Sequence, residues 1–207
     1  MSYVLINHGW TNTRPYGHWQ RNAAVDLRRQ GHQVFYPQYP NTANPNFDEW
    51  SSLLNAELNL LIETRADSTD EVIVIGHSLG CVNWLKSAAL GLLPEGFVAD
   101  RVLLVSPPEP VRLIGVPSFS FDPNDPAIKA AFRNAAKHTT VVASDNDVWL
   151  PSGIQKVYGE PFGIAPVLLP GVKHLSLSEG FSSWPGVIDW VNDPAADLTE
   201  HGGLTPA

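Results

Sequence analysis

The pattern Gly76-His77-Ser78-Leu79-Gly80 places a serine hydroxyl where it could act as a nucleophile. The apolar run Glu71–Ile75 leads straight into this pattern, and a helical pattern over Leu79–Leu90 leaves it. A sharp turn from strand to helix needs small residues on both sides of the serine, because the two backbones crowd there. The turn would also set Ser78 at a helix N-terminus, whose free N–H groups favour developing negative charge. The alternative is a tight turn with an incidental serine, and the flanking strand and helix disfavour it.

A serine hydroxyl needs a base to take its proton, and a histidine oriented by a carboxylate is the usual arrangement. The expected chain order for such a turn is serine, acid, histidine, so the base must follow Ser78. Apart from a histidine in the C-terminal tail, only His138 and His174 follow it. His138 is expected at the end of a helix, at the wrong edge of the sheet. His174 follows the apolar run Ala165–Leu169, at the carboxyl edge where ligands collect. We expect His174 to be the base; a solvated surface histidine is the alternative.

Two carboxylates, Asp145 and Asp147, follow the strand expected at Thr139–Ala143. Asp147 precedes the apolar residues Val148-Trp149-Leu150, which could bury and fix its side chain. Asp145 would then be a turn residue that accepts hydrogen bonds from local N–H groups. We expect Asp147 to orient the histidine, with Asp145 as the alternative.

An oxyanion site needs two backbone N–H groups aimed where charge develops. Leu79, directly after the serine, would supply one of them. The second should come from the loop after the first strand, His8-Gly9-Trp10, where Gly9 would let the Trp10 N–H turn inward. We expect the imidazole of His8 itself to be structural.

Short apolar runs alternate with longer amphipathic stretches, which is typical of βαβ units around a parallel sheet. Five prolines in Ser106–Asp125 predict an irregular segment that shapes the mouth of the site. We expect one domain, residues 1–192, and a loosely ordered tail, residues 193–207. The expected strands are Tyr3–Asn7, Gln33–Tyr36, Glu71–Ile75, Arg101–Val105, Thr139–Ala143 and Ala165–Leu169, and the expected helices are His18–Gln30, Phe47–Thr64, Leu79–Leu90, Pro126–Lys137 and Trp184–Val191.

The composition and charge indicate which kinds of binding partner are disfavoured for the protein. The 207 residues carry a formal net charge of −8, which disfavours binding to nucleic acid or to an anionic membrane surface. A single cysteine forms no internal disulfide, and neither a signal peptide nor a membrane-spanning run is evident. We therefore expect a cytoplasmic protein. No residue spacing indicates a metal or a nucleotide cofactor, and the sequence gives no indication of a protein partner.

The ordered set of motifs resembles the small serine hydrolases related to retinoblastoma-binding protein nine, over roughly Val4–Trp190. The residues that carry the resemblance are His8-Gly9-Trp10, His18-Trp19, Tyr39-Pro40, Pro45 with Trp50, Gly76-His77-Ser78-Leu79-Gly80-Cys81, Ser144-Asp145-Asn146-Asp147-Val148-Trp149-Leu150-Pro151, Lys173-His174, Gly180 and Trp184-Pro185. The chain departs from the family at Lys173, where glycine is usual, and at Val148, where proline is usual. Both departures leave Ser78, Asp147 and His174 in place, so they bear on substrate range.

The resemblance implies a minimal α/β-hydrolase fold without a large cap domain, and hydrolysis of small acyl substrates with ester or aminopeptidase-like activity. We expect six parallel strands in the order 2-1-3-4-5-6 with helices on both faces. The loop aromatics Trp10, Trp149, Phe119 and Phe121 are candidates for an apolar acyl pocket, although such residues often only cover a core edge.

Two other interpretations stay open at this point. A non-catalytic interaction module on the same fold would show a buried or misaligned Ser78. An aminopeptidase would need an acidic group near the mouth to hold a substrate ammonium, and Glu109 is the nearest candidate.

Overall fold

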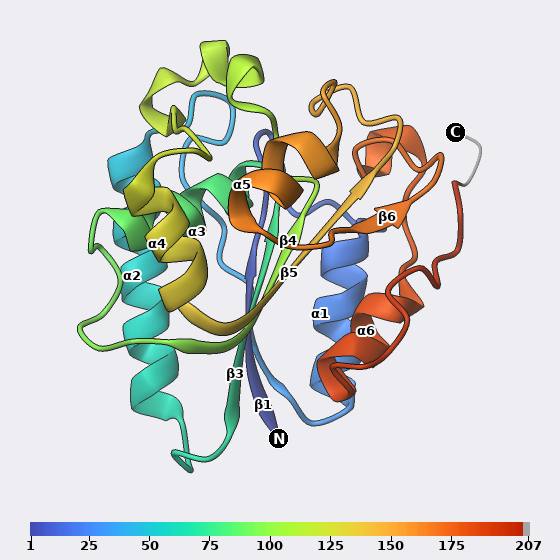
Figure 1. Cartoon of the computed structure of the whole chain (residues 1–207). Helices are drawn as coiled ribbons and strands as arrows, with labels where there is room; N and C mark the ends of the chain where they lie inside the picture. The colour runs from blue at the N-terminus through green and yellow to red at the C-terminus, as the bar shows by residue number, and fades with distance from the viewer. Residues whose placement is uncertain (205–207) are drawn as a thin grey trace.

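The computed structural model describes residues 1–204 and contains a six-stranded sheet between two layers of helices (Figure 1). The strand order is β2-β1-β3-β4-β5-β6, and every neighbouring pair is parallel. This confirms the predicted order and brings the carboxyl ends of all strands to one edge. The strands are β1 (Ser2–Asn7), β2 (Gln33–Phe35), β3 (Glu71–His77), β4 (Ala99–Val105), β5 (Ala136–Ser144) and β6 (Val167–Leu169).

The helices divide between the two faces of the sheet, as Figure 1 shows. Side chains alternate along β1 with the period of two of a strand: Tyr3 and Leu5 enter one core, and Val4 and Ile6 the other. None of the helices in residues 1–204 has the length and apolar character that a membrane span requires. α1 (Trp19–Arg29) and α6 (Pro185–Asn192) cover one face, whereas α2 (Phe47–Thr64), α3 (Leu79–Ala89), α4 (Pro126–Asn134) and the short α5 (Glu160–Phe162) lie on the other.

Two segments between β4 and β5 differ from the sequence prediction. α4 ends at Asn134 and β5 begins at Ala136, so His138 lies inside the strand, in register with Arg101, and not at a helix end. The segment Ser106–Asp125, predicted to be irregular, contains two 3₁₀ helices, η1 (Pro110–Gly115) and η2 (Pro117–Phe119). Each begins with a proline, whose fixed φ suits the first helical position.

The segment after α6 also differs from the prediction of a loosely ordered tail, because residues 193–204 pack back onto α6. Leu198 is buried, and its carbonyl accepts a hydrogen bond from the Trp184 indole N–H (2.9 Å). The N–H of Gly186 donates to the carbonyl of Glu200 (2.9 Å). Small polar residues favour a loose end, but one apolar anchor and backbone hydrogen bonds hold this segment. Residues 205–207 lie outside the described part of the chain.

Candidate active site

Ser78 occupies the turn between β3 and α3, at the carboxyl edge of the sheet. Its φ of 53° and ψ of −122° are a strained conformation for a residue with a side chain. A Cβ on Gly80 would lie 2.6 Å from the carbonyl oxygen of Asn7, and one on Gly76 would lie 3.1 Å from the nitrogen of Cys81. The two glycines therefore leave room for the close approach of backbones that this turn needs, as the sequence pattern predicts.

His174 lies between Ser78 and Asp147 and contacts both. Its Nε2 is 2.8 Å from the Ser78 hydroxyl oxygen, and its Nδ1 is 2.8 Å from Oδ2 of Asp147. The Asp147 side chain is 0% exposed, and its Oδ1 accepts a hydrogen bond from the Trp149 N–H (2.8 Å). A carboxylate on Nδ1 requires that nitrogen to carry the proton, which leaves the Nε2 lone pair free to accept the serine proton. The structure thus brings together the three residues that the sequence singled out.

Side chains of the loop after β5 hold the loop that carries His174. Oδ1 of Asn146 accepts hydrogen bonds from the Lys173 N–H (2.7 Å) and from the Ser144 hydroxyl (2.8 Å). Oδ1 of Asp145 accepts from the Gly171 N–H (2.8 Å). Asp145 is exposed, and instead of the local N–H groups predicted for it, it accepts from a backbone N–H of the histidine loop, while Asp147 is turned inward.

Two groups that the sequence analysis did not select also hold His174. The His77 Nε2 lies 2.9 Å from the His174 carbonyl oxygen, and Oε2 of Glu179 accepts a hydrogen bond from the His174 N–H (2.9 Å). Burial lowers the pKa of His77 well below its ordinary value, so His77 is neutral and donates from Nε2. Lys173 and Leu175, on either side of His174, both have positive φ (57° and 53°). The histidine is therefore fixed through its backbone as well as through its ring.

The backbone of Gly9 lies in close contact with Ser78. A Cβ at this position would lie 2.8 Å from Cβ of Ser78 and 3.3 Å from its hydroxyl oxygen. Leu79 and Trp10, the predicted oxyanion residues, both line the cavity onto which Ser78 opens. Leu79 is the first residue of α3, where N–H groups have no acceptor within the helix. The Trp10 indole N–H donates to the carbonyl of Ala43 (3.2 Å), which fixes this side chain at the mouth.

A cavity of about 700 Å³ opens above Ser78 and His174. Trp10 and Trp149 both line it and meet edge to face, with ring centroids 5.9 Å apart. Sequence reasoning missed most of the other lining side chains, because they lie on loops with no pattern that predicts direction. The other lining residues are Gly9, Thr11, Asn12, Pro15, His18, His77, Leu79, Pro108, Leu113, Ser176, Leu177 and Ser178.

Comparisons with known proteins agree with this geometry. Residues 4–193 match the protein family described as Serine hydrolase. The chain belongs to that serine hydrolase family. It is 25% identical over 189 residues to the putative hydrolase YdeN of Bacillus subtilis (strain 168), a match that covers 90% of this chain and 92% of YdeN.

Solved structures show the same fold for this serine hydrolase. The crystal structure of the ydeN gene product of B. subtilis aligns with a TM-score of 0.71 at 25% identity, covering 93% of this chain and 97% of that chain. A putative YdeN-like hydrolase from Pectobacterium atrosepticum aligns with a TM-score of 0.65 at 19% identity, covering 92% and 89%. Est1E from Butyrivibrio proteoclasticus aligns at 0.60 and 15% identity, covering 93% and 84%. The predicted minimal α/β-hydrolase fold is confirmed.

Three residues predicted near the mouth of this serine hydrolase are elsewhere. Phe119 is fully buried in the core against Phe47 and Trp50, because η2 folds it inward. Phe121 packs beside Tyr158 and does not line the cavity. Both carboxylate oxygens of Glu109 accept hydrogen bonds from Ser152, and Glu109 also lies outside the cavity lining.

His8 in this serine hydrolase is a structural residue, as predicted. Its Nδ1 donates to the Gly9 carbonyl (2.9 Å), and its Nε2 accepts from the Tyr39 N–H (2.9 Å). Burial lowers its pKa to about 4, so the ring is neutral. Within residues 1–204 no three His, Cys, Asp or Glu side chains are grouped so that they could hold a metal ion.

Proposed function

We propose that this serine hydrolase cleaves small acyl esters through Ser78, His174 and Asp147, and that it is a carboxylesterase-like enzyme of the retinoblastoma-binding protein nine type, acting in the cytoplasm. The observation that carries the proposal is the continuous pair of 2.8 Å contacts from the Ser78 hydroxyl through His174 to the buried Asp147. These contacts meet at the wall of a cavity large enough for a small substrate.

The reaction proceeds by two acyl transfers. The Ser78 oxygen attacks the ester carbonyl while its proton passes to Nε2 of His174, and the tetrahedral intermediate carries the negative charge on oxygen. His174 then gives the proton to the leaving alcohol, and the acyl group stays on Ser78. Water, deprotonated by His174, releases the acyl group as a carboxylic acid. Asp147 holds the proton-bearing Nδ1 throughout, and the N–H groups of Leu79 and Trp10 stabilise the oxyanion.

The lining of the cavity favours an uncharged substrate. In the described part of the chain, no aspartate, glutamate, lysine or arginine lines it. Trp10, Trp149, Leu113 and Leu177 offer apolar surface to an acyl chain. An aminopeptidase substrate would leave its ammonium group without a counter-charge, because Glu109 is engaged with Ser152. These observations favour a neutral ester over a peptide with a free amino terminus.

The competing interpretation is a non-catalytic interaction module. That interpretation predicts a Ser78 that is misaligned or sealed from solvent. Ser78 is 9% exposed but lines the cavity and lies within hydrogen-bond distance of His174. The geometry therefore supports the enzyme.

Hydrolysis of p-nitrophenyl acetate, butyrate and octanoate, compared with alanine p-nitroanilide, tests the proposal. We expect turnover of the esters, with little turnover of the charged anilide. The Ser78→Ala variant should lose ester turnover by a factor on the order of 10⁴ or more. Wild-type rates in a folded Ser78→Ala variant would contradict the proposed nucleophile, and preferred cleavage of the anilide would contradict the substrate class.

A further inference from the structure

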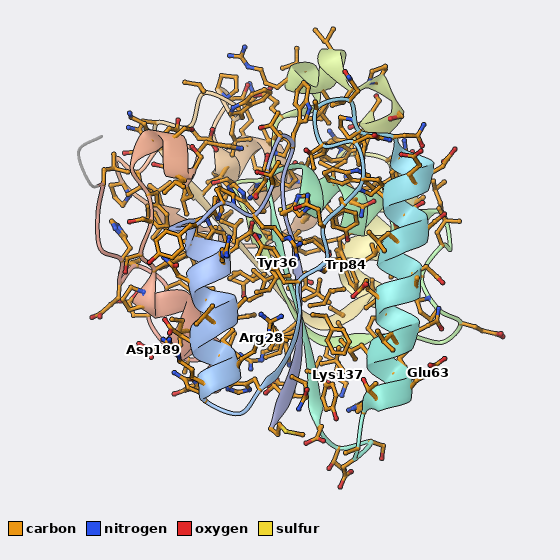
Figure 2. All side chains as sticks on the ribbon, turned by 180° about the vertical axis from the view of Figure 1, so that it is seen from behind. Arg28, Tyr36, Glu63, Trp84, Lys137 and Asp189 are labelled. Carbon is orange, nitrogen blue, oxygen red and sulfur yellow. The ribbon has the colours of Figure 1, made fainter. Side chains whose placement is uncertain are left out.

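A second hollow, of about 340 Å³, lies on the side of the sheet that α1 covers. It is lined by Thr13, Arg14, Arg21, Ala24, Val25, Arg28 and Tyr36, and it shares none of these residues with the cavity above Ser78. Figure 2 labels Arg28 on α1 and Tyr36 just after β2, on the two segments that bound this hollow. Three arginines around one small hollow are unusual for a chain of net charge −8.

Neutral acceptors hold each of the three guanidinium groups in place. Arg14 donates to the Gln38 side chain (3.1 Å) and to the carbonyl of Tyr36. Arg21 donates to the carbonyl of Arg14 (2.9 Å), and Arg28 donates to the carbonyl of Val34 (2.7 Å). An arginine has five N–H donors, so these contacts position the groups and leave other donors for a ligand.

The positive charge of this cluster is not neutralised within the described residues. No carboxylate of residues 1–204 forms an ion pair with Arg14, Arg21 or Arg28. Arg29, the next residue on α1, does pair with Asp26 (3.1 Å), so counter-charges are available to this helix. Three like charges close together repel one another, and an anion in the hollow would remove that repulsion.

The Tyr36 hydroxyl is an independent sign of a missing ligand. Tyr36 is 8% exposed, and its hydroxyl is buried with no hydrogen-bond partner. The Arg14 guanidinium lies 5.5 Å from the centre of its ring. A buried hydroxyl without a partner is destabilising, and most such groups have a partner when the complete system is present. Tyr36 is one of the residues that line the hollow that the arginines surround.

We propose that this hollow binds the phosphate group of a small molecule. Planar guanidinium groups recognise phosphate oxygens in pairs of hydrogen bonds, and the Tyr36 hydroxyl supplies a further donor. The volume admits a phosphate with a small attached group. Inorganic phosphate and an organic phosphomonoester share this chemistry. The site adjoins the active-site loop, since the Arg14 N–H donates to Asn12 (2.6 Å), which lines the cavity above Ser78.

Isothermal titration calorimetry with inorganic phosphate and with phenyl phosphate tests the proposal. Titrations at low millimolar ligand and matched ionic strength avoid the general stabilisation that concentrated phosphate gives. We expect saturable one-to-one binding in the wild-type protein. Arg21→Ala and Arg28→Ala should each weaken the Kd about tenfold. Arg29→Ala is the matched control on the same helix and should leave the Kd unchanged.

Tyr36→Phe separates a ligand role from a structural role. An unpartnered buried hydroxyl destabilises the unliganded fold, so this variant should unfold at the same or a higher temperature than wild type without phosphate and should bind phosphate roughly fivefold more weakly. Tighter binding of phenyl phosphate than of phosphate would assign the site to organic phosphates, and equal or weaker binding would assign it to the free ion. The absence of saturable binding of both probes, or equal effects of Arg29→Ala and Arg28→Ala, would overturn the proposal.

Discussion

Asp145 and Asp147 are two residues apart and differ in what their oxygens contact. Asp147 is sealed from solvent, with one oxygen on His174 and the other on the Trp149 N–H. Asp145 is exposed and accepts a hydrogen bond from the Gly171 N–H. The apolar residues after Asp147 predicted this division, but Val148 is 62% exposed, and the contact that holds the carboxylate from this segment is the Trp149 N–H. Only the Asp147 carboxylate therefore sets the tautomer of the proposed base.

Replacing each aspartate by asparagine distinguishes the roles of Asp145 and Asp147 in catalysis. In Asp147→Asn the amide no longer fixes the proton on Nδ1 of His174, and we expect the kcat for ester hydrolysis to fall by a factor on the order of 10⁴. Asp145→Asn keeps a side-chain oxygen for the Gly171 N–H, so its kcat should stay within about threefold of wild type. The measurement is steady-state hydrolysis of p-nitrophenyl acetate. Equal losses in the two variants would contradict the assignment.

At the scale of elements, the strands and their order could be predicted from the sequence, and with them the edge where Ser78, Asp147 and His174 meet. Short apolar runs predicted the buried strands, the family resemblance supplied their order, and parallel strands bring their carboxyl ends together. The lining could not be predicted, because the direction of a loop side chain depends on tertiary contacts. Phe119 shows this: its loop position suggested the mouth, and η2 packs it into the core. Ser176 and Leu177 carry no sequence signal, yet they line the cavity.

The hydrogen bonds between the acid loop and the histidine loop predict a positioning role for Asn146. Asn146→Ala removes the acceptor for the Lys173 N–H, and a displaced base lowers the rate, so we expect the kcat to fall roughly 10- to 100-fold. The KM should change little, because Asn146 does not line the cavity. Asn146→Asp retains an acceptor and should restore most of the kcat. A loss that Asn146→Asp does not rescue, or one confined to KM, would contradict the role.

At the scale of the whole molecule, the negative net charge coexists with buried neutral histidines around the site. His8, His18 and His77 all have lowered pKa values because burial penalises the charged ring, and for His8 and His18 the value is about 4. The net charge of the whole chain gave no sign of the local positive cluster formed by the three arginines of the second hollow. Arg21 and Arg28 lie two turns apart on one face of α1, and the packing of α1 beside β2 adds Arg14 and Tyr36 to them.

These lowered pKa values predict loss of stability in mild acid. An unfolded histidine titrates near pH 6.5, so below that pH the unfolded state binds protons that the folded state refuses until about pH 4. Between about pH 7 and about pH 5, His8 and His18 should each lower the free energy of unfolding by about 2 kcal/mol. Urea denaturation at the two pH values measures this loss.

His18→Asn is the informative variant for this pH dependence. His18 is the N-cap of α1 and accepts a hydrogen bond from the Gln20 N–H, a role that asparagine can also fill. The variant should lose about 2 kcal/mol less than wild type over the same pH interval. An unchanged pH dependence would show that the burial of His18 does not contribute to acid sensitivity.

The central claim is that Ser78 is a nucleophile activated by His174, and labelling by a fluorophosphonate probe tests it most directly. The probe reacts covalently with an activated serine whatever the natural substrate is. We predict rapid labelling of the wild-type protein, none of Ser78→Ala, and labelling of His174→Ala slowed by a factor on the order of 10⁴. A folded wild-type protein that does not label, or a Ser78→Ala variant that labels at the wild-type rate, would contradict the account.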